Sequence, residues 1–187
     1  IPHADHPKGL IAIIDIGSNA VRLVVYDGLN RAPFKIHTER ALCNLGADLA
    51  TTGYLNPDSV RKALDSIKRF SGLLDVMKIK TVRAVATAAM RDAKDGAAFM
   101  RKVKDETGLD VNVIDGDEEA RLAALGVMAN GLGKNGMIGD YGGGSLELIA
   151  VENGQVKDKV SLPLGSHRLQ AETTRAARIK SIDAHLN

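Results

Sequence analysis

The sequence is poor in cysteine, in aromatic residues and in net charge, and each shortage argues against a class of protein. Among 187 residues there is one cysteine, Cys43, so no internal disulfide can form. We expect Cys43 to be a small buried hydrophobe in a reducing compartment, which favours the cytoplasm. Aromatic residues make up only 3% of the chain, and the net charge is +2. With few stacking surfaces and no overall basic surface, we expect no nucleic-acid partner.

Long apolar runs and clustered metal ligands are also missing. No run approaches the length needed to span a membrane, and residues 1–8 lack the apolar core of a signal peptide. We therefore expect a loose leader at 1–8 and no membrane partner. The five histidines are scattered, without the spacing of a metal site. The composition is compatible with a homodimer but does not define the oligomeric state.

The chain is organised around a glycine turn between two apolar stretches. Residues 137–151 read MIGDYGGGSLELIAV. Gly142, Gly143 and Gly144 allow close approach of a ligand, and their N–H groups, with that of Ser145, can converge on an anion. Asp140 at the mouth of the turn suits a hard cation bound together with phosphate. The same letters also fit an ordinary glycine-rich hairpin.

A second copy of this pattern lies near the start of the chain. Residues 10–26 read LIAIIDIGSNAVRLVVY, and a shift of 125 positions places Asp15 on Asp140 and Gly17 on Gly142. Two copies of one turn predict two related lobes that face a shared cleft.

The apolar periodicity predicts an α/β fold with a mixed five-stranded sheet flanked by helices. Strands are expected at 10–16, 20–27, 34–40, 81–87 and 111–114, with a loop at 41–55 and a turn at 90–92. Helices are expected at 56–77, at 96–107 and from Asp117 to Met128. This first lobe covers 9–130. A second lobe, 131–187, begins in the same way, with strands to 141, at 146–151 and at 155–162 and a helix at 176–186, but stops early. We therefore expect a longer protein.

Two charged positions stand out between the glycine turns. Arg91 follows a predicted buried strand, where a bidentate phosphate contact is favoured, although a surface ion pair is an equally simple interpretation. Glu118 and Glu119 begin a predicted helix, and adjacent helical residues point about 100° apart. Only one of them can face a cleft as a general base. The other interpretation of this run is a charged helix start.

Taken together and in order, these segments resemble the exopolyphosphatase/guanosine pentaphosphate phosphatase family. The matching stretches are DIGSNA from Asp15, ATAAMRDA from Ala86, DGDEEARL from Asp115 and DYGGGSLEL from Asp140. The likeness covers about residues 10–169, including LPLG at 162–165. The departures are small: Ala20 and Ala88 each lack a hydroxyl, and Tyr141 replaces an aliphatic residue.

The resemblance implies an actin-like, sugar-kinase-like fold of two lobes with phosphate and metal between them. It implies that Glu119 activates water and that Arg91 neutralises charge on the phosphoryl group. The phosphate-binding residues that it implies are Ser18, Asn19, Gly142, Gly143, Gly144 and Ser145. For the metal, Mg²⁺ or Mn²⁺, it implies Asp140 and Glu147, with Asp15 as a further contact through water.

The resemblance implies a phosphoanhydride hydrolase, and the motifs leave its substrate open. The first reading is an exopolyphosphatase that releases orthophosphate from the ends of polyphosphate. The second is a phosphohydrolase for guanosine pentaphosphate (pppGpp), which would connect the protein to the stringent response. An ATP-dependent enzyme of the same superfamily is less favoured, because no adenosine-binding region is evident. A non-catalytic alarmone or nucleotide sensor is less favoured, because Glu119, Arg91, Asp140 and Glu147 are all present.

Overall fold

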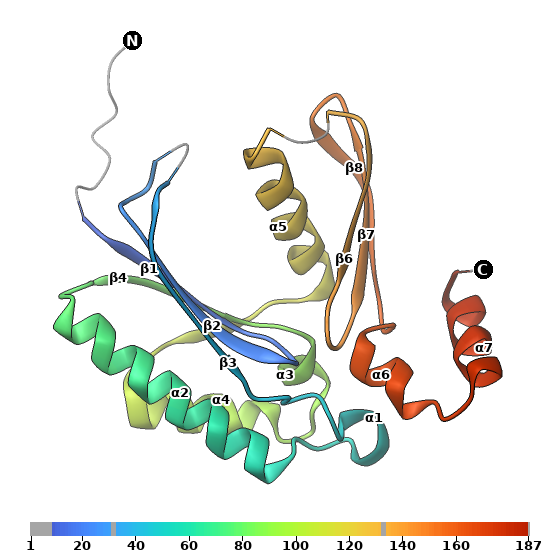
Figure 1. Cartoon of the computed structure of the whole chain (residues 1–187), viewed down its shortest axis with the longest axis horizontal. Helices are drawn as coiled ribbons and strands as arrows, with labels where there is room; N and C mark the ends of the chain where they lie inside the picture. Colours follow the sequence, from blue (N-terminus) through green and yellow to red (C-terminus); the bar gives the residue numbers. More distant parts are fainter. Residues whose placement is uncertain (1–8, 31–32, 132–133, 187) are drawn as a thin grey trace.

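The computed structural model describes residues 9–30, 33–131 and 134–186, which form two sheets with helices around them (Figure 1). The strands are β1 (Ile11–Ile16), β2 (Ala20–Tyr26), β3 (Lys35–Leu42), β4 (Thr81–Ala86), β5 (Val111–Val113), β6 (Gly136–Tyr141), β7 (Leu146–Glu152) and β8 (Gln155–Leu162). The helices are α1 (Leu49–Thr52), α2 (Pro57–Val76), α3 (Ala88–Asp92), α4 (Gly96–Thr107), α5 (Gly116–Ala129), α6 (Ser166–Ala171) and α7 (Arg175–Leu186).

The first sheet has the strand order β3-β2-β1-β4-β5 and carries the larger core. β1 pairs antiparallel with β2 and parallel with β4, so the sheet is mixed, as the sequence predicts. Helices α2 and α4 lie together against one face (Figure 1). Apolar side chains that alternate along β1 and β2 meet Ile67 and Phe70 of α2 in that core.

The second sheet, β6-β7-β8, is antiparallel and packs against α5. Ala120 and Ala124 on α5 form a small buried cluster with Ile149 and Val151 of β7. The division of the chain near residue 130 stays a prediction. The helix that precedes this division nevertheless packs on the second sheet, so α5 joins the two lobes.

The internal repeat predicted from the 125-residue shift is present in the backbone geometry. Asp15 pairs with Arg22 across β1–β2, and Asp140 pairs with Glu147 across β6–β7, at the same shift. In the two turns, the amides of Gly17 and Gly142 each donate to the carbonyl three residues on, both at 3.0 Å. The pairing of the second strand with the third is irregular at matching places too, between residues 25 and 26 of β2 and between residues 150 and 151 of β7.

Most predicted elements are confirmed, and the differences lie in short helices. Asn56 caps α2 by accepting from two amides, and Gly108 ends α4 with φ 70°. The predicted turn at 90–92 is wrong, because these residues belong to α3. The loop at 41–55 contains α1, and α6 was not predicted. The last helix of the first lobe begins at Gly116 rather than Asp117, because the Asp115 side chain caps it.

Cys43 is buried, as expected, and burial raises the pKa of its thiol. The expected leader at 1–8 lies outside the described residues. Within the described part of the chain, no helix is both long and apolar enough to cross a membrane.

Candidate active site

The glycine turn after β6 is held from behind by the start of α6. All three glycine carbonyls accept backbone hydrogen bonds from this segment. The bonds are Ser166 N to Gly142 O at 3.0 Å, His167 N to Gly143 O at 2.9 Å and Gly165 N to Gly144 O at 3.3 Å. Within the described residues, the amides of Gly143, Gly144 and Ser145 form no hydrogen bond. The turn therefore has its acceptors satisfied and its donors free, as an anion-binding turn requires.

The turn after β1 is built in the same way. The carbonyl of Ser18 accepts from Gly46 N at 2.9 Å, and the carbonyl of Asn19 accepts from the amides of Cys43 and Asn44 at 3.1 and 2.9 Å. These bonds come from the segment that follows β3, as α6 follows β8. Ser18 is buried, so this turn is packed into the lobe and is not an exposed surface loop.

The two lobes touch at Gly144. A Cβ atom built on Gly144 would lie 2.6 Å from Ser18 Oγ and 2.7 Å from Ala88 Cβ, closer than real side chains approach. Gly165 is equally constrained, because its Cβ would lie 2.3 Å from the carbonyl carbon of Gly144. The glycines predicted to allow close approach are needed for contact between the lobes as well as for a ligand.

A cavity of about 460 Å³ lies beside this contact and is lined by both turns. It brings together most of the predicted site residues, from both lobes. Its lining includes Asp15, Ser18, Asn19, Glu119, Asp140, Gly142, Gly143, Gly144 and Ser145. Two predicted site residues do not line it: Arg91 binds Glu119, which does, and Glu147 is buried.

Arg91 and Glu119 form an ion pair at the edge of this cavity. Nη1 of Arg91 donates to Glu119 Oε2 and to the carbonyl of Ile114, both at 2.8 Å. Burial raises the pKa of Glu119, Arg91 opposes this shift, and the Glu147 and Asp15 carboxylates reinforce it. Glu118 points elsewhere and binds Arg121 at the surface. The sequence expectation that only one of the two glutamates faces the cleft is confirmed.

Carboxylates from both lobes surround the cavity. Burial raises the pKa of Asp15, Arg22 opposes that shift, and the nearby Asp140 carboxylate adds to it. Glu147 is 1% exposed and accepts a hydrogen bond from Ser161 Oγ at 2.7 Å. No three His, Cys, Asp or Glu side chains among the described residues are grouped closely enough to hold a metal by themselves.

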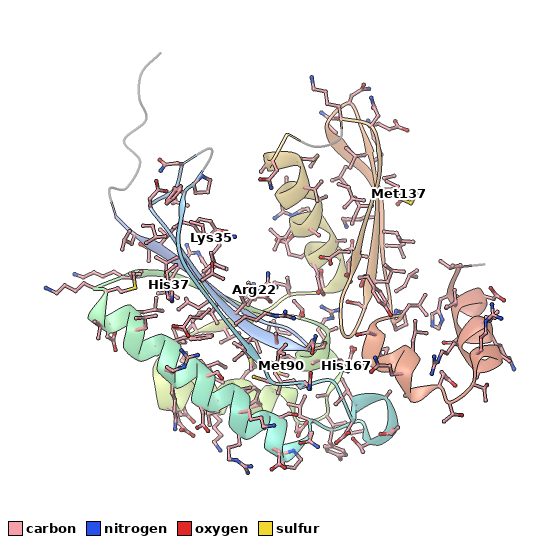
Figure 2. The ribbon with its side chains drawn as sticks, viewed as in Figure 1. Arg22, Lys35, His37, Met90, Met137 and His167 are labelled. Atoms are coloured by element: carbon pink, nitrogen blue, oxygen red, sulfur yellow. The ribbon has the colours of Figure 1, made fainter. Side chains whose placement is uncertain are left out.

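Two arginines that the sequence reasoning missed also line the cavity. Arg22 and Arg40 are directly opposite each other on β2 and β3, and both side chains reach the cavity that Glu119 lines (Figure 2 labels Arg22). Like charges in directly opposed positions repel, and an anion between them would relieve the repulsion. Arg22 also lies directly opposite Asp15 across β1–β2. The sequence carries only part of this signal, because the pairing of Arg22 with Arg40 depends on the register of β2 with β3.

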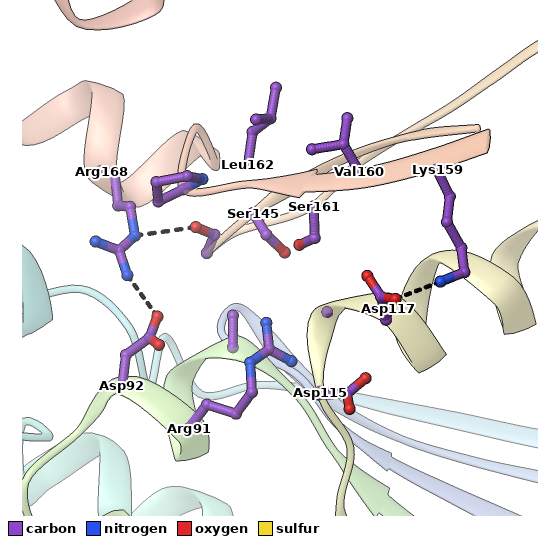
Figure 3. A pocket seen from close by; sticks show the side chains of 14 residues that line it. Arg91, Asp92, Asp115, Asp117, Ser145, Lys159, Val160, Ser161, Leu162 and Arg168 are labelled. Carbon is purple, nitrogen blue, oxygen red and sulfur yellow. Dashed lines mark hydrogen bonds and ion pairs between the residues drawn. The ribbon is translucent and has the colours of Figure 1, made fainter. Parts of the chain in front are cut away.

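A second cavity of about 580 Å³ adjoins the first at Ala88, Gly144 and Ser145. Figure 3 shows it between α3, the start of α5 and the end of β8. Its cations are Arg91, Lys159 and Arg168. Lys159 pairs with Asp117 at 2.5 Å, and Arg168 pairs with Asp92.

Two lobes that repeat one three-stranded unit, and whose turns line a shared cavity, define an actin-like fold. Within that class, residues 24–180 of this chain match the sequence model of the Ppx/GppA phosphatase family. The chain belongs to this family.

Individual relatives agree with the assignment. The chain is 31% identical over 158 residues to the guanosine-5'-triphosphate,3'-diphosphate pyrophosphatase of Aliivibrio fischeri, covering 83% of this chain and 32% of the relative. It is 29% identical over 165 residues to exopolyphosphatase 1 of Mycobacterium bovis, covering 87% and 48%. The crystal structure of an exopolyphosphatase from Cytophaga hutchinsonii superposes with a TM-score of 0.85 and 28% identity, covering 95% of this chain and 60% of that one. The chain thus spans about a third to a half of these two curated relatives.

Proposed function

We propose that the protein is a metal-dependent exopolyphosphatase that hydrolyses the terminal phosphoanhydride bond of inorganic polyphosphate. The observation that supports this most directly is the shared cavity. Gly143, Gly144 and Ser145, whose amides form no hydrogen bond among the described residues, line the same cavity as Glu119, which Arg91 holds in place. A terminal phosphoryl group bound by the amides would lie beside a carboxylate able to accept a proton from water.

The residues divide the reaction between them. Glu119 accepts a proton from water as the water oxygen bonds to the terminal phosphorus and the bridging P–O bond breaks. The electron pair of that bond leaves on the shortened chain. A carboxylate whose pKa is raised by burial is a better base near neutral pH than an exposed one. Arg91 holds Glu119 and offsets charge on the phosphoryl oxygens. The amide turns of the two lobes hold the phosphate from both sides.

The carboxylates suit a divalent metal ion such as Mg²⁺ or Mn²⁺. Asp15 and Asp140 line the cavity, each adds to the local negative charge, and the buried Glu147 lies directly opposite Asp140 across β6–β7. Because no group of three ligands is preassembled in the described residues, the ion would be held by one or two carboxylates together with substrate phosphate and water, as is usual for Mg²⁺. When bound, it would supply Lewis-acid stabilisation of the phosphate charge.

The alternative substrate is pppGpp, whose 5'-terminal phosphoanhydride presents the same chemistry. The Aliivibrio fischeri relative carries that activity in its name. We favour polyphosphate because the second cavity continues the first past Gly144 and gives a chain of phosphates room to extend. The three cations of its lining are balanced by three carboxylates, Asp92, Asp115 and Asp117, so this preference rests on space and not on net charge. A non-catalytic sensor is disfavoured because the Glu119–Arg91 pair is intact. The buried Cys43 agrees with a cytoplasmic location.

The test is phosphate release by the full-length protein with Mg²⁺, from long-chain polyphosphate and pppGpp in parallel. We expect release from polyphosphate to be faster, and Glu119→Ala to lower kcat about 10²–10⁴-fold, the usual contribution of a general base. Faster release from pppGpp would select the alternative. Near-normal kcat in Glu119→Ala would overturn the role of Glu119. Ligand binding without release from either substrate would indicate a sensor.

A further inference from the structure

Arg168 on α6 connects the phosphate turn of the second lobe to α3 of the first. Its Nε donates to the carbonyl of Gly144 at 3.1 Å, and its Nη2 donates to the carboxylate of Asp92 (Figure 3). Asp92 directly follows Arg91, which in turn holds Glu119. A continuous path of contacts therefore runs from the turn, through Arg168 and α3, to the proposed base.

The geometry needs an arginine. A guanidinium has several donors fixed in one plane, so it can bind two acceptors that lie in different directions. Here one acceptor belongs to the second lobe and the other to the first. A lysine ammonium is a single point and would bind one acceptor well and the other poorly. The Gly144 carbonyl already accepts from Gly165 N, so Arg168 adds a second donor on the side of the turn away from the free amides.

A simple contribution to stability does not account for this arrangement. The side chains of Arg168 and Asp92 are 33% and 36% exposed, and ion pairs with such exposure contribute little to folding. The arrangement instead fixes a relative position. Gly144 meets Ala88 at the start of α3 by direct contact, and Arg168 binds Asp92 at its end. The short helix that carries Arg91 is thus held at both ends against the turn.

We propose that Arg168 is a positioning residue that sets the placement of the Gly142–Ser145 turn relative to Arg91 and Glu119. Its effect on turnover rests on the proposed hydrolase function; its effect on the turn does not. Loss of Arg168 leaves the turn amides present but allows them to shift against α3. Displacements of about 1 Å in a catalytic site can lower the rate about 100-fold. We therefore expect kcat to fall further than KM rises.

The experiment compares four variants of the full-length protein with the wild type. Arg168→Ala should lower kcat about 10–100-fold with at most a few-fold rise in KM, and Arg168→Lys should recover only part of the loss. Asp92→Asn removes the carboxylate but leaves the bond from Arg168 to the Gly144 carbonyl, so it should have a smaller effect than Arg168→Ala. Lys68→Ala removes a comparable exposed pair, with Glu106, on the far helices and should change neither constant.

A double variant and a measurement without substrate separate positioning from stability. Arg168→Ala combined with Asp92→Asn should cost less than the product of the two single effects, because both remove the same ion pair. Hydrogen exchange should become faster in Arg168→Ala in peptides covering 165–167, whose amides bind the turn carbonyls, and 88–92. It should stay unchanged in Lys68→Ala.

The outcomes separate the two proposals. An active wild type with unchanged kcat in Arg168→Ala, or with independent effects of Arg168 and Asp92, would overturn the positioning role. Full recovery of kcat by Arg168→Lys would do so as well. An inactive wild type would overturn the hydrolase, and the exchange rates would still decide whether Arg168 holds the turn.

Discussion

At the scale of single residues, two carboxylates of the site, Asp15 and Glu119, are kept in an environment that disfavours their ionised form. Asp15 lies in the partly buried end of β1, where burial and the neighbouring Asp140 raise its pKa in spite of Arg22. A raised pKa means that the folded state binds the Asp15 proton more tightly than the unfolded state does. The ionised Asp15 side chain therefore costs stability at neutral pH, which is expected of a group kept for binding a cation.

Asp15→Asn should stabilise the metal-free protein at neutral pH. The pKa of Asp15 is higher in the folded than in the unfolded state. Protonated Asp15 therefore stabilises the fold fully below its unfolded-state pKa, and this stabilisation is lost as the pH rises through its folded-state pKa. The melting temperature of Asp15→Asn should thus exceed that of the wild type near pH 7 in EDTA, and the difference should vanish in acid. Thermal unfolding across this pH range measures it.

The matched control is Asp65→Asn, an exposed position on α2. It should change stability by no more than about 0.5 kcal/mol at any pH. A wild type more stable than Asp15→Asn at neutral pH in EDTA would show that Arg22 outweighs burial, and the raised pKa would be wrong.

Residue roles were predictable from the sequence where local geometry decides them. The 100° spacing separated Glu118 from Glu119, and the structure assigns the first to Arg121 and the second to Arg91. Arg22 and Arg40 were missed because their partnership depends on the register of β2 with β3, which sequence pattern does not provide. The contact between Arg168 and Asp92 spans 76 positions and was equally out of reach.

At the scale of elements, the glycine turn after β6 needs glycine because a side chain would not fit between the lobes, and not only because glycine has a flexible backbone. Gly144 does not have a positive φ, yet any side chain there would clash with Ser18 and Ala88 in the other lobe. The sequence argument gave the right residues with an incomplete reason. Short helices were the weak point: α3 and α6 have five and six residues, too few for a helical period to be visible.

Gly144→Ala should separate the lobes and reduce activity more than it reduces stability. The new methyl group would lie within 2.7 Å of Ser18 and Ala88, so the turn must move away from the first lobe. We expect kcat/KM to fall at least 100-fold and unfolding free energy by about 1–3 kcal/mol, the usual cost of overpacking. Steady-state kinetics and denaturant unfolding measure the two effects.

The control for this prediction is Gly72→Ala, at a solvent-exposed position in the middle of α2, where an added Cβ would have no neighbour within 4 Å. It should stabilise the protein by about 0.5–1 kcal/mol with activity unchanged, because alanine is the better helix former. Wild-type activity in Gly144→Ala would mean that the lobes need not touch at this turn.

At the scale of the whole molecule, the repeat explains why the fold was the most predictable feature. One design of strand, turn and strand occurs twice, and each copy is followed by a segment that binds the turn's carbonyls from behind. Local pattern fixes each copy, and the contacts at Gly144 then fix how the copies meet. The packing of α5 on the second sheet was not predictable, because its small buried residues, Ala120 and Ala124, give only a weak apolar stripe.

A polyanion that binds between the lobes should protect both of them together. Full-length Glu119→Gln, which binds but does not hydrolyse, should be stabilised by tripolyphosphate with Mg²⁺, by about 2.7 kcal/mol at 100 times Kd. EDTA should remove most of this gain, because carboxylates at Asp15 and Asp140 then face the phosphate charge without a cation. Hydrogen exchange should slow in both turns, at 17–20 and at 142–145. Protection of one turn alone would place the ligand on a single lobe and contradict a shared site. Equal stabilisation in EDTA would mean that the amides and arginines bind the anion without the metal ion, and the proposed role of the carboxylates would be wrong.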